Sequence, residues 1–228
     1  MRRVFRRVGA RHTLAYLLSR LLSAASGDRV RLVKYLIVAQ PIGAGALDAV
    51  KPDRSTEIVQ AGPQSELARY FPRPDAVIRR RFASGASCYC ALVKKEFAGF
   101  LWILADRYEE DEVRCTYVLE APQQSVWDFD VYIEPKFRLS RTLARLWHAV
   151  DARLNERGVR WSFSRISAFN AESLAAHAKL GIIECQSATF LVIGQFQLSF
   201  LSQRPYVHAS FSACRRPAIR LDLPAIKA

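Results

Sequence analysis

The strongest constraint on the fold is a stretch of strict alternation at residues 126–134. Apolar and polar side chains alternate there with the two-residue period of a β-strand, which puts alternate residues on opposite faces of a sheet. One face carries Trp127, Phe129, Val131 and Ile133, and the other carries Asp128, Asp130, Tyr132 and Glu134. We therefore expect a strand with one core face and one acidic face, which ends at Pro135.

The residues that follow change to the period of a helix. From about Ser140 to Arg157, one helical face carries Leu143, Leu146, Trp147, Val150 and Leu154, and Gly158 then ends the helix. Residues 159–168 again look like a strand. A strand, a helix and a second strand of these lengths form a crossover unit, so strands 126–134 and 159–168 should run parallel.

The other predicted strands favour antiparallel pairing. They cover residues 30–39, 86–93, 97–105, 113–119 and much of 182–200; Lys94, Lys95 and Glu96 form a hairpin turn, and residues 106–112 form an acidic turn. Helical segments are predicted within 65–82 and over 172–180. The predicted fold class is mixed α/β: a mostly antiparallel twisted sheet with a parallel strand pair and flanking helices. We predict a basic extension at 1–51, a principal domain at 52–202 and a basic tail at 203–228.

The positive charge is concentrated at the two ends of the chain. The formal net charge is +13, but residues 35–202 carry only 20 basic against 19 acidic side chains. An enzyme that acts on nucleic acid would be expected to line its folded body with Lys and Arg. The distribution therefore argues against a nucleic-acid partner.

The cysteines support neither a disulfide framework nor a metal site. The five cysteines form no CxxC pair and have no histidine at zinc-ligand spacing. Cys88 and Cys90 lie in an apolar run and are read as small buried side chains. We expect no metal and a cytoplasmic location.

An apolar stripe in the N-terminal segment has two interpretations. A helix here would place Leu14, Leu17, Leu18, Leu21, Leu22 and Ala25 on one stripe, and Gly27 would end it. The stripe is too short, and too charged at Arg20, for a transmembrane span or a signal peptide. It either packs on the following domain or rests on anionic lipid, which would be peripheral contact of residues 1–27 with the inner face of the membrane.

Two motifs carry a family resemblance. The segment Pro135-Lys-Phe-Arg138-Leu-Ser-Arg141-Thr-Leu143 opens the long helix, and Asn170-Ala-Glu-Ser173 begins a short helix that closes in Lys179-Leu-Gly181. With the order of elements, they resemble the GNAT family of acyl-coenzyme A dependent N-acyltransferases over about residues 55–200. The resemblance implies a parallel strand pair that splays apart, and direct transfer of an acyl group from acetyl-coenzyme A or another acyl-coenzyme A to an amine. The acceptor would be a small molecule or a protein.

The resemblance also implies a cofactor site. The pyrophosphate of coenzyme A would bind at the turn into the long helix, at Arg138, Leu139, Ser140, Arg141, Thr142 and Leu143, where helix N–H groups favour an anion. Arg141 and Leu143 stand where the family usually has glycine or alanine, so charge and hydroxyl groups would have to compensate. The pantetheine arm would bind main chain near Val131 and Ile133, and Asn170 would cap its helix and touch the arm. A plain basic helix start capped by Ser140 is the alternative.

The implied catalytic groups lie on the acidic face and on the short helix. Glu134 or Asp130 would receive the proton of the amine, and Tyr132 or His177 would protonate the leaving thiolate. His177 stands where many family members have Tyr. The alternatives are an ordinary solvated acidic edge and a surface histidine. The competing function is a catalytically inactive module that binds a partner or a membrane surface.

Overall fold

The protein divides into two compact units, which we describe separately. The computed structural model describes residues 10–45, 50–51 and 53–225. The first unit runs up to Gln40, over Arg107–Glu120 and from Phe163 onward, and the second covers Pro41–Asp106 and Ala121–Ser162. The predicted boundary near residue 52 falls on a residue outside the described ones, and the domain limits stay a prediction.

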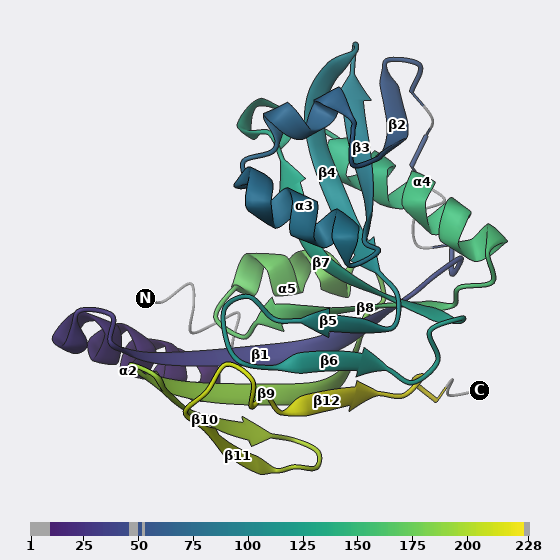
Figure 1. The fold of residues 1–228 in the computed structure, drawn as a ribbon. Coiled ribbons are helices and arrows are strands. Elements are labelled where there is room, and N and C mark those ends of the chain that lie inside the picture. The colour runs from purple at the N-terminus through teal and green to yellow at the C-terminus, as the bar shows by residue number, and fades with distance from the viewer. Residues whose placement is uncertain (1–9, 46–49, 52, 226–228) are drawn as a thin grey trace. The chain divides into compact units, whose positions relative to one another are not determined.

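The first unit contains two sheets and two helices (Figure 1). Its larger sheet has the strand order β11-β10-β9-β1-β8, and its smaller sheet has the order β12-β6-β5. The elements are α2 (Ala10–Ser26), β1 (Val30–Pro41), β5 (Arg107–Glu109), β6 (Thr116–Leu119), β8 (Trp161–Ser167), α5 (Ala171–Ala178), β9 (Ile183–Ile193), β10 (Phe196–Leu201), β11 (Val207–Ser210) and β12 (Ala218–Leu221).

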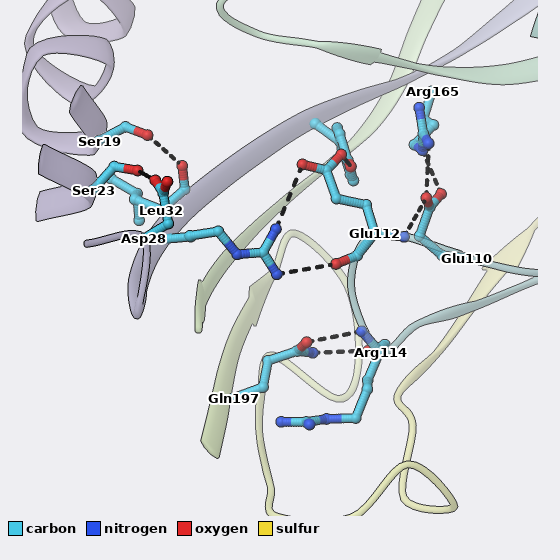
Figure 2. A network of polar contacts seen from close by, with 11 residues as sticks. Ser19, Ser23, Asp28, Leu32, Glu110, Glu112, Arg114, Arg165 and Gln197 are labelled. Carbon is cyan, nitrogen blue, oxygen red and sulfur yellow. Dashed lines mark hydrogen bonds and ion pairs between the residues drawn. The ribbon is translucent and has the colours of Figure 1, made fainter. Parts of the chain in front are cut away.

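Packing and polar contacts explain how distant segments join this unit. Leu36 and Val38 of β1 form a buried cluster with Ile166 and Ala168, on which Leu174 of α5 packs. Segment 107–120 is tied in by polar contacts: the Arg165 guanidinium binds the buried Glu110 carboxylate, and the Gln197 amide bonds both main-chain groups of Arg114 at 2.8 Å (Figure 2). A bidentate ion pair satisfies Glu110, which would otherwise be costly to bury.

The N-terminal helix of the first unit is only half covered. The Ser19 hydroxyl of α2 donates to the Leu32 carbonyl at 2.8 Å (Figure 2). The Tyr16 ring packs edge-on against Phe169. Leu18 and Leu21 remain 47% and 67% exposed. Packing on the unit therefore accounts for part of the predicted stripe and leaves part of it in solvent; the Leu14 side chain lies outside the described residues.

The second unit is a sheet with helices. Its strand order is β7-β4-β3-β2, with the first residues of β8 beside β7. Its elements are β2 (Thr56–Ala61), the 3-10 helix η1 (Glu66–Tyr70), α3 (Asp75–Ala83), β3 (Ser87–Val93), β4 (Glu96–Leu104), β7 (Ser125–Ile133), the 3-10 helix η2 (Pro135–Phe137) and α4 (Thr142–Glu156). Leu146, Trp147, Val150 and Leu154 of α4 are buried as predicted, whereas Leu143 is 40% exposed.

The predicted fold class is confirmed. The described strands pair mostly antiparallel, helices flank the sheets, and α4 connects β7 to its neighbour β8 in the predicted crossover. The 86–93/97–105 hairpin is present, with Lys94 and Lys95 at positive φ in its turn. The prediction of an acidic turn at 106–112 is wrong in part, because the chain bends at 106 and from 111, but β5 forms over Arg107–Glu109 and pairs with β6. The tail from 203 contributes β11 and β12, and β12 runs parallel to β6.

Candidate functional site

A β-bulge in β7 changes the predicted faces of the strand. Trp102 of β4 pairs with Asp130, but the next residue, Ile103, pairs with Asp128, so Phe129 is the extra residue of a bulge. Directly paired residues point to the same face, and Trp102 and Ile103 point to opposite faces. Asp128 and Asp130 therefore lie on opposite faces. The prediction of one acidic face over 128–134 is wrong.

Neither aspartate lies on a solvated edge. Asp128 is buried and accepts a hydrogen bond from the Ser162 hydroxyl at 2.9 Å. The Asp130 carboxylate, only 10% exposed, accepts from Arg73 Nε at 2.8 Å, Arg73 Nη2 at 2.7 Å and Arg81 Nη1 at 2.6 Å. A carboxylate whose oxygens are already bound by two guanidinium groups is badly placed to take a proton from a substrate.

Tyr132 and Glu134 come together at the end of β7. The Tyr132 phenol lies on the same face as Asp130, opposite Phe100 of β4, with ring centroids 5.6 Å apart. Desolvation and the hydrogen-bonded Glu134 carboxylate raise the pKa of Tyr132 above its usual range, although Arg138 and Arg73 oppose the rise. The pair thus holds a phenol that keeps its proton next to a carboxylate that can accept one.

Gly99 allows the main chain of Tyr132 to lie close to strand β4. Gly99 pairs with Ile133, and a Cβ atom at Gly99 would lie 2.2 Å from the Tyr132 carbonyl oxygen. A residue with a side chain would force the two strands apart at this point. The close approach of β4 and β7 beside the Tyr132–Glu134 pair therefore depends on glycine.

Hydroxyl groups in the turn from β7 into α4 form hydrogen bonds within the turn itself. The Ser140 hydroxyl donates to the Phe137 carbonyl at 2.6 Å, lies 2.8 Å from the Thr142 hydroxyl and accepts from the Thr142 N–H at 3.2 Å. Thr142 is buried, and Arg141 rather than Ser140 is the N-cap residue. Both hydroxyl groups shape the turn, which leaves the arginines and the positive end of the α4 dipole as its anion-binding elements.

The charged and apolar side chains of this turn point outward. Arg138 and Arg141 are exposed, and Leu139 is fully exposed. The Arg138 Nε group donates to the Ile133 carbonyl at 3.1 Å, which holds the guanidinium close to the end of β7. Val131 is 37% exposed on β7.

The remaining predicted site residues belong to the first unit. The Asn170 side chain caps α5 as expected, because its Oδ1 accepts from the Ser173 N–H at 3.0 Å. The Nδ1 atom of His177 lies 2.8 Å from the Ser173 carbonyl oxygen, which can only accept, so Nδ1 carries the proton of the neutral ring and Nε2 is the atom left for other partners. The predicted roles of both residues in acyl transfer stay predictions.

The sequence analysis missed Arg73 and Arg81. Both precede the strands on which the resemblance rests, and only the fold brings them to Asp130. The run Arg79-Arg80-Arg81 in α3 signals positive charge but not which arginine turns inward.

Cysteine thiols and possible metal ligands are two other kinds of reactive group in the chain. Burial, with the neighbouring Cys90, raises the pKa of the Cys88 thiol, so this side chain is a poor nucleophile. No three His, Cys, Asp or Glu side chains gather into a metal-binding group in the part of the chain that the structure describes. None of the helices in that part is long and apolar enough to span a membrane.

Comparisons with known proteins give distant likenesses of fold. No protein-family model and no curated protein sequence matches the chain. Among solved structures, a tandem GNAT protein from the clavulanic acid biosynthesis pathway has 14% identity and a TM-score of 0.49, over 74% of this chain and 56% of its own. A conserved protein from Staphylococcus epidermidis, described as functionally unknown, has 11% identity and a TM-score of 0.49, over 74% and 64%.

A third solved structure is an aminoglycoside acetyltransferase from an uncultured soil metagenomic sample. It has 12% identity and a TM-score of 0.41, over 57% of this chain and 90% of its own. The chain therefore spans less than two thirds of two of these three relatives. Likenesses at this level do not assign it an activity or a substrate.

Proposed function

We propose that the protein is an N-acyltransferase of the GNAT type, which moves an acyl group, in the simplest case acetyl, from acyl-coenzyme A directly to an amine. The observation that carries the proposal is the Tyr132–Glu134 pair, a phenol whose pKa is raised by desolvation and by the neighbouring Glu134 carboxylate. The pair lies directly before a basic turn and the N-terminus of a helix. Such a turn suits a pyrophosphate, and such a pair suits proton transfer.

The residues have complementary roles in this mechanism. Glu134 takes the proton that the attacking amine releases as its nitrogen bonds to the thioester carbonyl carbon. Tyr132 gives its proton to the thiolate released when the carbon–sulfur bond breaks. The proton then on Glu134 passes to the neighbouring Tyr132 phenolate, so the pair is restored. His177 stays a second candidate donor, and Asp130 is assigned to holding Arg73 and Arg81.

Acyl-coenzyme A, as co-substrate, would supply the activated acyl group. We assign its pyrophosphate to Arg138, Arg141 and the first N–H groups of α4, and its arm to main chain near Val131 and Ile133. The exposed arginines and the N-terminal end of α4 fit an anion, although Arg141 and Leu143 carry side chains where the family usually has glycine or alanine.

Calorimetric titration with coenzyme A and with acetyl-coenzyme A tests the proposal. Saturable binding, together with acetyl transfer to a primary amine such as butylamine detected as free thiol release, is the expected result. The absence of coenzyme A binding in a protein that is folded by circular dichroism would contradict it, and would favour the non-catalytic module.

We also propose that the protein works in the cytoplasm and that α2 rests on anionic lipid. Leu18 and Leu21 are exposed beside the exposed Arg20, which is the pattern of an interfacial helix. Flotation with phosphatidylserine vesicles should be lost in Leu21→Ser and retained in Leu139→Ser, which removes an even more exposed leucine elsewhere. Equal flotation of both variants would contradict lipid contact through α2.

A further inference from the structure

Two arginines share a single carboxylate on the face of β7 that carries Tyr132. Arg73 comes from the loop before α3 and Arg81 from α3 itself, and both bind Asp130. Among the described residues, Asp130 is the only carboxylate paired with either arginine. This cluster of Arg73, Arg81 and Asp130, which we call the arginine cluster, therefore keeps one positive charge in excess.

The excess positive charge of the arginine cluster is largely buried. The side chains of Asp130 and Arg81 are 10% and 11% exposed, and the Arg81 guanidinium lies 5.4 Å from the Trp102 ring centroid and 5.1 Å from that of Phe129. The Arg81 Nε atom is buried and has no hydrogen-bond partner in the described part of the chain. Charges interact more strongly in such surroundings than in water, so an added anion would be attracted.

Arg73 is the member of the arginine cluster that is most accessible to solvent. Its side chain is 32% exposed, about three times the value for Arg81. The Arg73 guanidinium lies 5.8 Å from the Phe100 ring, and Phe100 in turn contacts the Tyr132 ring. Asp130 and Tyr132 are two residues apart on one strand, which corresponds to about 7 Å. A molecule of modest length could thus reach both Arg73 and the Tyr132–Glu134 pair.

We propose that the arginine cluster binds a carboxylate of the acceptor, so that the acceptor is a small molecule with an amine at one end and a carboxylate at the other. This inference rests on the proposed acyl transfer. The carboxylate would meet the Arg73 guanidinium in charge-assisted hydrogen bonds, and the amine would face Glu134. The same excess of positive charge would disfavour a diamine or polyamine acceptor.

Three probes of similar length separate the alternatives. Titration calorimetry of the full chain would use 4-aminobutyrate, butylamine, which lacks the carboxylate, and 1,4-diaminobutane, which carries a second cation. We expect 4-aminobutyrate to bind about 10- to 100-fold more tightly than the other two, the range of a hydrogen-bonded charge contact. Equal binding of all three probes, or tighter binding of the diamine, would overturn the proposal.

Three variants test whether the preference is local to the cluster. Arg73→Gln should remove the preference for 4-aminobutyrate, because Asp130 then keeps only Arg81, and Arg73→Lys should restore part of it. Arg79→Gln removes the same charge from the exposed side of α3 and should leave the preference unchanged. An equal loss in Arg79→Gln would overturn the local site in favour of a general charge effect.

The measurements distinguish this proposal from the proposed reaction. If coenzyme A does not bind, acyl transfer fails, whereas Arg73-dependent binding of 4-aminobutyrate would still support the anion site. If acetyl is transferred to butylamine as readily as to 4-aminobutyrate, the reaction stands and the carboxylate preference is overturned. Circular dichroism of each variant shows whether a loss of binding reflects a loss of fold.

Discussion

The neighbouring side chains of Tyr132 and Glu134 have opposite tasks in the proposed reaction. Glu134→Gln removes the proton acceptor and Tyr132→Phe removes the donor, so each should lower kcat for acetyl transfer by about 100- to 10,000-fold, the usual contribution of general acid–base catalysis. Coenzyme A affinity should hardly change. Glu66→Gln, an exposed position in η1, is the control. Full activity of both variants would assign proton removal to water.

The pH profile is a separate test of Tyr132. Its pKa is raised above the usual 10.0, so the phenol keeps its proton, and its ability to donate, up to and beyond that pH. The rate constant kcat/KM should therefore rise as the amine loses its proton and should show no loss caused by Tyr132 below pH 10. An alkaline loss centred near pH 8 that disappears in Tyr132→Phe would contradict this assignment.

Arg138 tests the cofactor turn. Its guanidinium is exposed and held to the Ile133 carbonyl, so Arg138→Ala should weaken coenzyme A binding by about 1 to 3 kcal/mol if a phosphate contact is lost. Arg157→Ala, at the other end of α4, removes the same charge and should bind normally. Calorimetric titration measures both variants. Unchanged affinity in Arg138→Ala would place the pyrophosphate elsewhere.

Among the elements, the ones set by local pattern could be predicted from the sequence. The helical spacing of α4 and the Lys94–Lys95 turn are local signals, and both are present. The bulge at Phe129 leaves no such signal, because one extra residue in β7 depends on its pairing with β4. A one-residue change of this kind moves later side chains to the other face, which is why the acidic face was wrongly predicted.

The site residues divide in the same way. Asn170 as a helix cap follows from residue type and position, and the structure confirms the cap. The capture of Asp130 by Arg73 and Arg81 joins segments about fifty residues apart in sequence, so no local pattern predicts it. Strand β5 is only three residues long and was too short to recognise within the acidic turn.

Gly99 ties the pairing of β4 and β7 to the geometry of Tyr132. Gly99→Ala should destabilise the protein by about 1 to 3 kcal/mol, the usual cost of overpacking, because the new Cβ meets the Tyr132 carbonyl. Denaturant unfolding measures the loss, and kcat should fall as well. Gly62→Ala has no atom within 4 Å of its Cβ and is the matched control. Equal stability of the two variants would contradict the close approach.

At the scale of the whole molecule, the two units differ in how far apart in the sequence their segments lie. The second unit is built mainly from neighbouring segments. Strands β2, β3 and β4 are adjacent in the sheet in their sequence order, with η1 and α3 between β2 and β3 and a short turn between β3 and β4. The first unit collects three distant segments, pairing β1 with β9 and β6 with β12. Its completion therefore depends on residues close to the C-terminus, which a sequence reading expects to be only a basic tail.

The pairing of β6 with β12 sets an order in time for a chain that leaves the ribosome from its N-terminus. Strand β6 emerges about a hundred residues before its parallel partner β12, and the sequence separation between β1 and its partner β9 is larger still. Contacts so distant in sequence close slowly. Arrested nascent chains should thus show a protease-resistant second unit before the first unit becomes resistant. Until β12 is synthesised, β6 offers an open strand edge, to which a chaperone or another nascent chain could bind.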